Sequence, residues 1–274
     1  MTLALTGLDG KVAVVTGAGR MSGIGRGIAV ELARGGCDVV ITGSGRAPED
    51  CPAEEQAAGW RDIDSVAEEV RALGRAALPV VSDVADAESV QALADKVMAE
   101  LGRVDFVVNN AGAARAGDRA PVVDVDAAAW RQVIDVNLNG SFYMSQSFGR
   151  KLIEQGEGGC IINISSIGGK LMAPTTAAYA ASKAGIHALT CAMAGEVGSY
   201  GIRVNAICPG IVMTSRLADR SEEQWQGIID SYIPLQRAGK PADIGSMVAY
   251  LCSDQGNWIS GQLYSVDGGQ LAGR

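Results

Sequence analysis

The sequence has one histidine and no long apolar run, and each shortage excludes a class of function. Because His187 is the sole histidine among 274 residues, most zinc sites are excluded, and any Ser-His-Asp triad would depend on that side chain. No apolar run approaches the roughly 18 residues of a membrane-spanning helix, and the first residues lack a basic stretch followed by an apolar one. We expect a cytoplasmic protein with no metal site and no membrane partner.

Paired cysteines and an excess of positive charge are also absent. The six cysteines form no C-x-x-C pair, and several lie in apolar runs such as 160–162, which favours buried free thiols in a reducing compartment. Lys and Arg number 23 against 31 Asp and Glu, a net charge of −8, so we expect no nucleic-acid partner. Hydrophobic residues at 47% and charged residues at 20% exclude an intrinsically disordered chain.

Short apolar runs alternate with helical patterns along the whole chain. The runs are continuously apolar, as in strands buried on both faces of a parallel sheet, and predict strands at Val12–Thr16, Val39–Thr42, Ala77–Val81, Phe106–Asn109, Cys160–Ile164, Arg203–Ile207 and Gln262–Val266. Apolar spacing predicts helices from Ile24 to Gly35, over Asp62–Leu73, from about Ala87 to Leu101, from Trp130 towards Ile153, over 175–199 and from Pro241 to Cys252. We therefore predict an α/β fold, with residues 1–274 forming a single domain around a doubly wound parallel sheet (Rossmann fold) of about seven strands.

Two segments interrupt this alternation. Arg46–Arg61 contains two prolines and several acids, and we expect it to form a loop that is long for a strand–helix connection. Ser215–Ile233 lies between a strand and the last helix and contains Trp225 and Tyr232. Long segments of this kind are often functional, so we predict a substrate lid at about residues 213–234.

The first predicted strand leads into a glycine-rich turn over residues 16–25, and a helix follows at once. Glycines let the backbone turn sharply and approach a pyrophosphate, and a helix N-terminus supplies unpaired N–H groups with a partial positive charge. The strict G-x-G-x-x-G spacing is not met, because Ser22 occupies the last glycine position after Gly17 and Gly19. A nucleotide-binding turn is the hypothesis, and an ordinary glycine-rich turn is the alternative.

The end of the second strand bears on which dinucleotide would bind. A carboxylate there accepts bonds from the adenosine ribose and selects NAD, whereas this strand ends in Gly43 and Ser44 without an acid. Arg20 and Arg46 are nearby cations that could pair with a 2′-phosphate. We therefore predict NADP(H) over NAD(H); solvated surface charge is the alternative role for both arginines.

Tyrosine and lysine four residues apart mark a candidate catalytic group. Tyr179 and Lys183 share one face of an alanine-rich helix, and Ser166 follows a buried strand at the sheet edge where such folds bind ligands. Reduction of a ketone by hydride transfer leaves an alkoxide that needs a proton. A tyrosine can supply it when a lysine ammonium favours the phenolate, while a serine hydroxyl orients the carbonyl.

These motifs, in this order, resemble the short-chain dehydrogenase/reductase family over about residues 8–269. The resemblance implies catalytic roles for Asn137, Ser166, Tyr179 and Lys183. It implies cofactor contacts from Gly17, Gly19, Arg20, Gly23, Ile24, Gly25, Ser44, Asp83, Val84, Asn110, Ala111, Gly112, Tyr179, Lys183, Pro209, Gly210, Val212 and Thr214. The sequence departs from the family pattern in a glycine turn two residues longer, near Arg20-Met21, and in the insertion at 46–61.

The substrate side of the predicted site is less defined. We expect the pocket among residues 113–120, 168–177 and the lid, lined by Met172, Met213, Leu217, Trp225 and Tyr232. Arg216 and Arg220 could pair with an anionic substrate or could be exposed lid charges. The resemblance implies a homotetramer or homodimer, and the apolar stripe Ile186, Leu189 and Met193 fits either such an interface or an intramolecular core.

We therefore predict an enzyme that interconverts a ketone and a secondary alcohol as small-molecule substrates, using NAD(P)(H) with NADP(H) favoured. One alternative is a 3-oxoacyl-(acyl carrier protein) reductase, because the sequence resembles such members of the family. Another is an NAD-dependent sugar or polyol dehydrogenase. An alternative of a different class is a non-catalytic nucleotide-binding scaffold, although all four catalytic positions are filled here.

Overall fold

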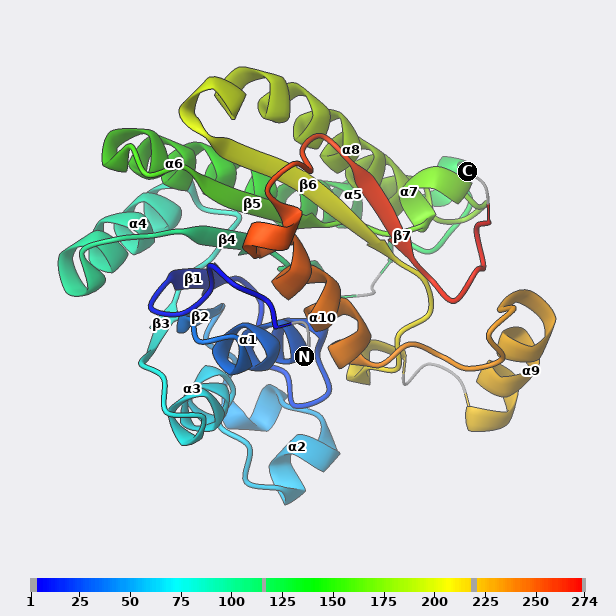
Figure 1. Ribbon diagram of the computed structural model, residues 1–274. Helices are drawn as coiled ribbons and strands as arrows, with labels where there is room; N and C mark the ends of the chain where they lie inside the picture. Colours follow the sequence, from blue (N-terminus) through cyan, green and yellow to red (C-terminus); the bar gives the residue numbers. More distant parts are fainter. Residues whose placement is uncertain (1–3, 115–116, 218–220, 273–274) are drawn as a thin grey trace.

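The computed structural model describes residues 4–114, 117–217 and 221–272. One parallel sheet of seven strands runs through it in the order β3-β2-β1-β4-β5-β6-β7 (Figure 1). The strands are β1 Val12–Val15, β2 Asp38–Gly43, β3 Ala77–Val81, β4 Phe106–Asn109, β5 Gly159–Ile164, β6 Ile202–Pro209 and β7 Leu263–Val266. The predicted doubly wound α/β fold is confirmed, and each strand end lies within two residues of its predicted position.

The inner strands β1, β2, β4, β5 and β6 are buried on both faces, because successive residues face opposite helix layers, whereas the edge strands β3 and β7 are partly exposed. In β1, Val12 and Val14 join one apolar cluster, whereas Ala13 and Val15 join the other. All four are at most 4% exposed. This double burial explains why the strands are continuously apolar in sequence instead of alternating with polar residues.

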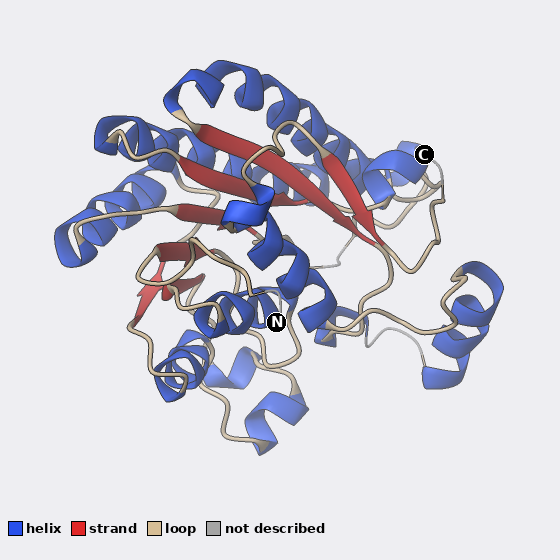
Figure 2. Ribbon diagram, viewed as in Figure 1, coloured by secondary structure: helices blue, strands red, loops and turns tan. Residues whose placement is uncertain are grey.

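Helices cover the two faces of the sheet in separate layers (Figure 2). One layer contains α1 Ile24–Arg34, α3 Ile63–Ala72 and α10 Pro241–Cys252, and the other contains α4 Ala87–Leu101, α6 Gly140–Gln155 and α8 Ala177–Val197. Local chemistry sets several helix ends. Asp86 caps α4 by accepting the Glu88 N–H, and Gly102 ends that helix in the left-handed conformation.

Both segments that interrupt the alternation contain helices that the sequence analysis did not predict. The supposed loop at 46–61 contains a short 3₁₀ helix, Pro48–Asp50, and α2, Ala53–Ala57. The lid segment contains α9, Glu222–Tyr232, which begins at a capping box between Ser221 and Gln224. The expectation of a plain loop at 46–61 was therefore wrong, and the helix in the lid segment was not foreseen, because capping and good helix-forming residues act locally even without a long apolar period.

The apolar stripe on α8 belongs to the core of this chain. Ile186 is 1% exposed and Met193 is 9% exposed, and Met193 packs in the cluster between α4, α6 and α8. Burial of Ile186 and Met193 supports the intramolecular interpretation for these two residues, whereas Leu189 is half-buried.

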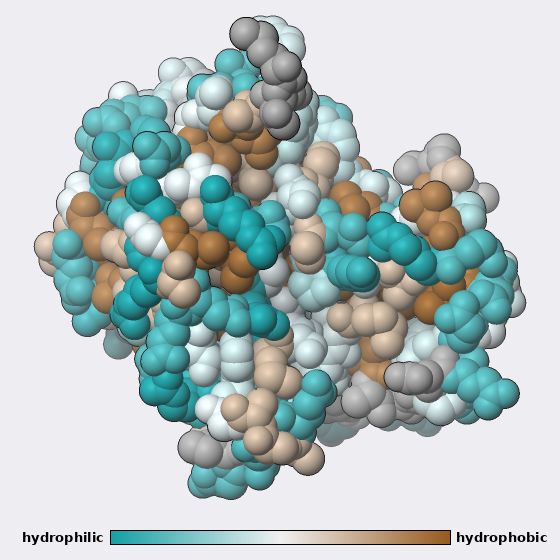
Figure 3. All heavy atoms as spheres, turned by 60° about the horizontal axis from the view of Figure 1, so that its bottom comes forward, coloured by the Kyte–Doolittle hydropathy of each residue, from teal (hydrophilic) through white to brown (hydrophobic). Residues whose placement is uncertain are grey.

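No helix in the described ranges is both long and apolar enough to cross a membrane. Figure 3 turns the lower part of Figure 1 toward the viewer, and apolar residues there form small patches interspersed with hydrophilic ones. Scattered apolar residues are ordinary on protein surfaces.

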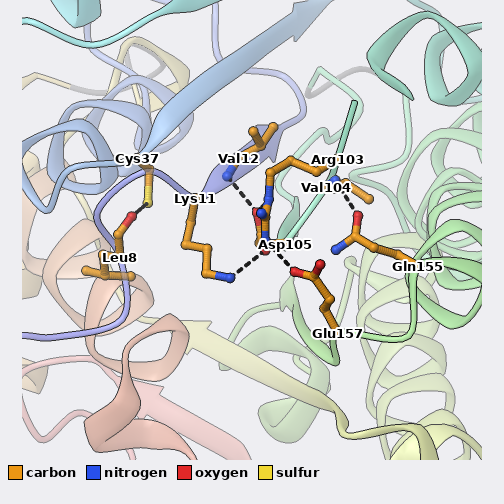
Figure 4. Close-up of polar contacts among 9 residues, drawn as sticks. All are labelled: Leu8, Lys11, Val12, Cys37, Arg103, Val104, Asp105, Gln155 and Glu157. Atoms are coloured by element: carbon orange, nitrogen blue, oxygen red, sulfur yellow. Dashed lines mark hydrogen bonds and ion pairs between the residues drawn. The ribbon is translucent and has the colours of Figure 1, made fainter. Parts of the chain in front are cut away.

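A buried carboxylate, that of Asp105, joins the amino ends of the neighbouring strands β1 and β4 (Figure 4). Asp105 accepts hydrogen bonds from Arg103, from Lys11 at 3.0 Å and from the Val12 N–H at 2.9 Å. The Asp105 carbonyl also accepts the Cys160 N–H of β5. Burial opposes ionisation of the carboxyl, but the bonds from Arg103, Val12 and Lys11 outweigh it and lower the pKa of Asp105.

We predict that Asp105→Asn lowers the free energy of unfolding by about 2–3 kcal/mol at neutral pH, because charge-assisted bonds to a buried group are lost. The lowered pKa means that this stabilisation is present above about pH 4 and is lost as pH falls through the folded-state pKa. Urea unfolding between pH 3 and 7 tests this, with the exposed Asp124→Asn as control. Equal stability of the Asp105 variant and the wild type at pH 7 would contradict the prediction.

Candidate active site

A cavity of about 610 Å³ lies at the carboxyl edge of the sheet. The strand order reverses there, between β1 and β4, and doubly wound folds bind ligands at such reversals. The predicted site residues that line it are Gly17, Arg20, Gly23, Ile24, Asn110, Gly112, Ser166, Tyr179, Lys183, Pro209, Gly210, Val212 and Thr214. Segments distant in sequence are therefore brought together around one cavity.

Close backbone packing explains the glycines in the first turn. Gly17 has φ of 63°, and a Cβ there would lie 2.7 Å from the Ala111 Cα. A Cβ on Gly25 would lie 2.6 Å from the Asn110 Nδ2. Gly23 precedes α1 and contributes no side-chain cap, so the first N–H groups of the helix are available to an anion.

Hydrogen bonds fix this turn against the end of β4. Thr16 Oγ1 accepts the N–H groups of Asn110 and Ala111, each at 3.0 Å. The Asn110 Nδ2 donates in return to the carbonyls of Thr16 and Gly17, at 2.8 and 3.0 Å. Asn110 and Ala111 thus hold the turn in place, and Ala111 does so from behind the cavity wall.

Hydrogen bonds join the lengthened glycine turn to the 46–61 insertion. The Glu55 carboxylate, from α2, accepts the Met21 N–H at 2.9 Å. The Trp60 Nε1 donates to the Gly19 carbonyl at 2.6 Å, and the Arg26 guanidinium lies 5.2 Å from the Trp60 ring centroid. The two departures from the family pattern are therefore one structural unit at the adenosine end of the predicted site.

The cofactor prediction assumed that Arg46 is a free cation at this end, but the structure shows its guanidinium paired with carboxylates. Its guanidinium donates to Glu55 at 3.0 Å and to Asp62 at 2.8 Å, and its side chain is 17% exposed. Arg20 lines the cavity, in agreement with its predicted place. Ser44 is exposed directly after β2, and Asp83 and Val84 follow β3; none of the three lines the cavity.

Tyr179, Lys183 and Ser166 come together in the lining of the cavity. A Cβ on Gly168 would lie 3.1 Å from the Tyr179 Cε1 and 3.2 Å from the Ser166 Oγ, so both side chains flank the same small space. The Lys183 Nζ lies 5.9 Å from the Tyr179 ring centroid and donates to the Ile164 carbonyl at 2.8 Å. This arrangement brings the Tyr179 phenol, the Lys183 ammonium and the Ser166 hydroxyl into one site.

Asn137 lies behind the cavity in a π-helical turn. The predicted helix from Trp130 is divided into α5, Ala127–Ile134, the π turn Asp135–Asn139, and α6. The fully buried Asn137 accepts the Ala113 N–H at 2.8 Å and donates to the Ser182 Oγ at 3.0 Å. The π turn therefore links the cavity loop to α8, and such turns are frequent at functional sites.

The sole histidine lies beside the site and outside the cavity lining. The His187 Nε2 is 2.8 Å from the Ser165 Oγ and 3.3 Å from the Cys208 Sγ. Burial, followed by the charges of Lys170 and Lys183, lowers the pKa of His187, so it is neutral at neutral pH.

The substrate side agrees only in part with the sequence prediction. Leu217 and Trp225 line the cavity. Met172 and Tyr232 are instead 62% and 66% exposed, and Met213 lines a separate hollow between α1 and α10. These three do not line the cavity, because a residue's apolar character does not indicate which way its side chain faces. The Arg216 side chain and Arg220 lie outside the described residues.

Arg119 is a cavity residue that the sequence analysis did not single out. Its guanidinium carbon lies 4.6 Å from the Tyr179 ring centroid, and its Nε lies 3.4 Å from the Asp118 carboxylate. It belongs to the loop that was expected to border the substrate, so its charge was the signal that could have identified it.

The chain is similar to known proteins over nearly its whole length. A family model described as "Enoyl-(Acyl carrier protein) reductase" matches residues 17–270. The chain is 36% identical to a 2-dehydro-3-deoxy-D-gluconate 5-dehydrogenase of Escherichia coli, covering 99% of this chain and 100% of that protein. It is 38% identical to a 3-oxoacyl-[acyl-carrier-protein] reductase of Staphylococcus aureus, covering 94% and 97%.

A solved structure gives the same result. Carveol dehydrogenase from Mycobacterium avium in complex with NAD is 30% identical, with a TM-score of 0.85 over 96% of this chain and 98% of that one. The match of sequence, fold and site order leads to one conclusion: the chain belongs to the short-chain dehydrogenase/reductase family and is an oxidoreductase of the NAD(P)-dependent type.

Proposed function

We propose that the protein interconverts a ketone and a secondary alcohol, with Tyr179 as the proton donor in reduction and acceptor in oxidation. The observation that carries the proposal is the placement of Tyr179, Lys183 and Ser166 around one small space in the cavity. When bound, the nicotinamide cofactor supplies or accepts the hydride. The glycine turn fits the pyrophosphate of that cofactor, because its backbone is stripped of side chains at Gly17 and Gly25.

Each residue has a distinct part in the proton transfer. Tyr179 gives its hydroxyl proton to the developing alkoxide, and the Lys183 ammonium stabilises the negative charge left on the phenolate. Ser166 donates to the carbonyl oxygen and holds it within reach of Tyr179. Asn137 positions the cavity loop and α8 through its two side-chain bonds, and we propose that it supports the proton relay.

Arg119 supports a substrate with an anionic group near the reacting carbonyl. It lines the cavity beside Tyr179, and a guanidinium matches a carboxylate with paired hydrogen bonds. The Escherichia coli relative is named for a sugar acid, and the Staphylococcus aureus relative for a 3-oxoacyl chain. We favour a small oxo acid or hydroxy acid, because a charge next to the catalytic tyrosine suits it better than a purely apolar chain.

Cofactor preference, assembly and location complete the proposal. The prediction of NADP(H) loses part of its support, because Arg46 is paired with Glu55 and Asp62. We propose a homotetramer or homodimer, supported by Phe142, 40% exposed, and Trp258, 95% exposed. A cytoplasmic location is supported by six free cysteines. We treat the chain as one domain in which the segment at 213–234 serves as the lid.

We predict that Tyr179→Phe lowers kcat by about 10²–10⁴-fold while dinucleotide binding stays unchanged, because only the transferable proton is removed. Steady-state rates on a panel of ketones and oxo acids, with calorimetric binding alongside, measure both. The exposed Tyr200→Phe is the control. A Phe variant with near wild-type turnover would refute the mechanism, and a wild type that binds dinucleotide without any turnover would favour the scaffold alternative.

Arg119→Gln is expected to lower kcat/KM for a 3-oxo carboxylate by about tenfold or more, close to 1.4 kcal/mol, while the methyl ester loses little. The ester lacks the charge that the guanidinium would bind, so the difference isolates that pairing. Arg150→Gln, exposed on α6, is the control. Equal losses for acid and ester would show that Arg119 does not select the substrate's charge.

Gly25→Ala is expected to weaken dinucleotide binding at least about tenfold and to lower the free energy of unfolding by about 1–3 kcal/mol. The added Cβ would lie 2.7 Å from both the Gly17 carbonyl oxygen and the Ala18 Cα, so the turn must shift. Gly195→Ala on α8 is the control, because its Cβ would meet nothing within 4 Å. Calorimetric binding and urea unfolding measure both effects, and unchanged binding by the Gly25 variant would contradict the role of this turn.

A further inference from the structure

A carboxylate from outside β2 lies at the place where β2 ends without an acid. A Cβ on Gly43, the last residue of β2, would lie 3.2 Å from the Asp62 Oδ2. A Cβ on Gly19, in the glycine turn, would overlap the Asp62 Oδ1 and lie 2.9 Å from Oδ2. The Asp62 carboxylate therefore lies between the phosphate-binding turn and the end of β2.

The backbone conformation of Asp62 prevents its side chain from capping the helix that follows. Asp62 is the N-cap residue of α3, a position where aspartate normally accepts helix N–H groups. Here its side chain caps nothing, and its φ of 49° is in the left-handed region that residues with side chains rarely adopt. Among the described residues, Arg46 is the one hydrogen-bond donor to the carboxylate, through Oδ1, and none donates to Oδ2; the side chain is 13% exposed and lies outside the lining of the 610 Å³ cavity.

The insertion holds the carboxylate in this position. Arg46 bridges Asp62 and Glu55, and Glu55 is 1% exposed and bound to the Met21 N–H of the lengthened turn. Burial opposes the charge of Arg46, but the bonds and charges of Asp62 and Glu55 outweigh it and raise the pKa of the guanidinium. One guanidinium faces two carboxylates, so the group retains one negative charge.

This geometry points to Asp62 as the residue that binds the adenosine ribose and selects NAD(H) over NADP(H). In doubly wound folds an acid at the end of β2 accepts the ribose 2′-hydroxyl, and the same charge repels a 2′-phosphate. The sequence analysis found no acid there because Asp62 follows β2 by nineteen residues and arrives through the insertion. The inference rests on the proposed dinucleotide site and reverses the NADP(H) prediction made from Ser44 and Arg46.

Binding of the 2′-phosphate by Arg46 is the competing interpretation. It would require Arg46 to be shared with or released from Asp62 and Glu55, which would leave the buried Glu55 carboxylate without its cation. Variants at Asp62 distinguish the two interpretations. If Asp62 binds the ribose, removal of its charge should favour NADPH. If Arg46 binds the 2′-phosphate, the same change should disturb the placement of Arg46.

The test is calorimetric titration of the full-length protein with NADH and NADPH. We expect the wild type to bind NADH at least about tenfold more tightly, and both Asp62→Asn and Asp62→Ala to reduce the ratio of the two dissociation constants to about threefold or less. In Asp62→Asn the change should come mainly from tighter NADPH binding. Circular dichroism melting confirms that the variants are folded.

Asp64→Asn is the matched control, because it removes the same charge from an exposed position two residues further on and should leave the ratio unchanged. Tighter NADPH binding by the wild type would overturn the inference, as would an unchanged ratio in both folded Asp62 variants. Binding of neither dinucleotide would be a different failure, because it would refute the proposed cofactor site itself.

Discussion

The site depends on the close approach of two chain segments at the carboxyl ends of β1 and β4. Thr16 and Asn110 exchange hydrogen bonds across this gap, and the absence of side chains at Gly17 and Gly25 lets the backbones meet. Parallel strands place all their carboxyl ends at one edge, so an anchor between the two central strands sets the position of every loop around it. The cavity, the start of α1 and helix α8, which carries Tyr179 and Lys183, are all arranged about that anchor.

Much of the fold could be predicted because its signals are local. Strands buried on both faces are mostly apolar along their length, and the inner strands were recognisable for that reason, whereas the edge strands β3 and β7 are only partly buried. Tyr179 and Lys183 were recognisable because a helix brings residues four apart onto one face. The family resemblance extended these local signals to Asn137 and to the cofactor contacts, whose roles remain predictions.

The parts that could not be predicted depend on long-range contacts. No local pattern indicates that Asp62 returns to the end of β2, because its position depends on Arg46, on buried Glu55 and on an uncommon backbone conformation. Arg119 similarly meets Tyr179 across sixty residues of chain. Charges in loops have no periodicity, so sequence alone left their partners open.

The π turn at Asp135–Asn139 also changes the direction in which side chains point on the two helices that it joins. The Gly140 N–H donates to the Asp135 carbonyl five residues back, and the Ser141 hydroxyl donates to the Asn137 carbonyl. In a regular helix each residue advances the side chains by about 100°. The additional residue in this turn therefore rotates α6 relative to α5, so that α6 packs its buried face on the sheet while Val133 of α5 packs against Ala113 and Ala178. Asn137, for which a catalytic role is proposed, therefore lies in the turn that changes the direction in which the side chains of the two helices point.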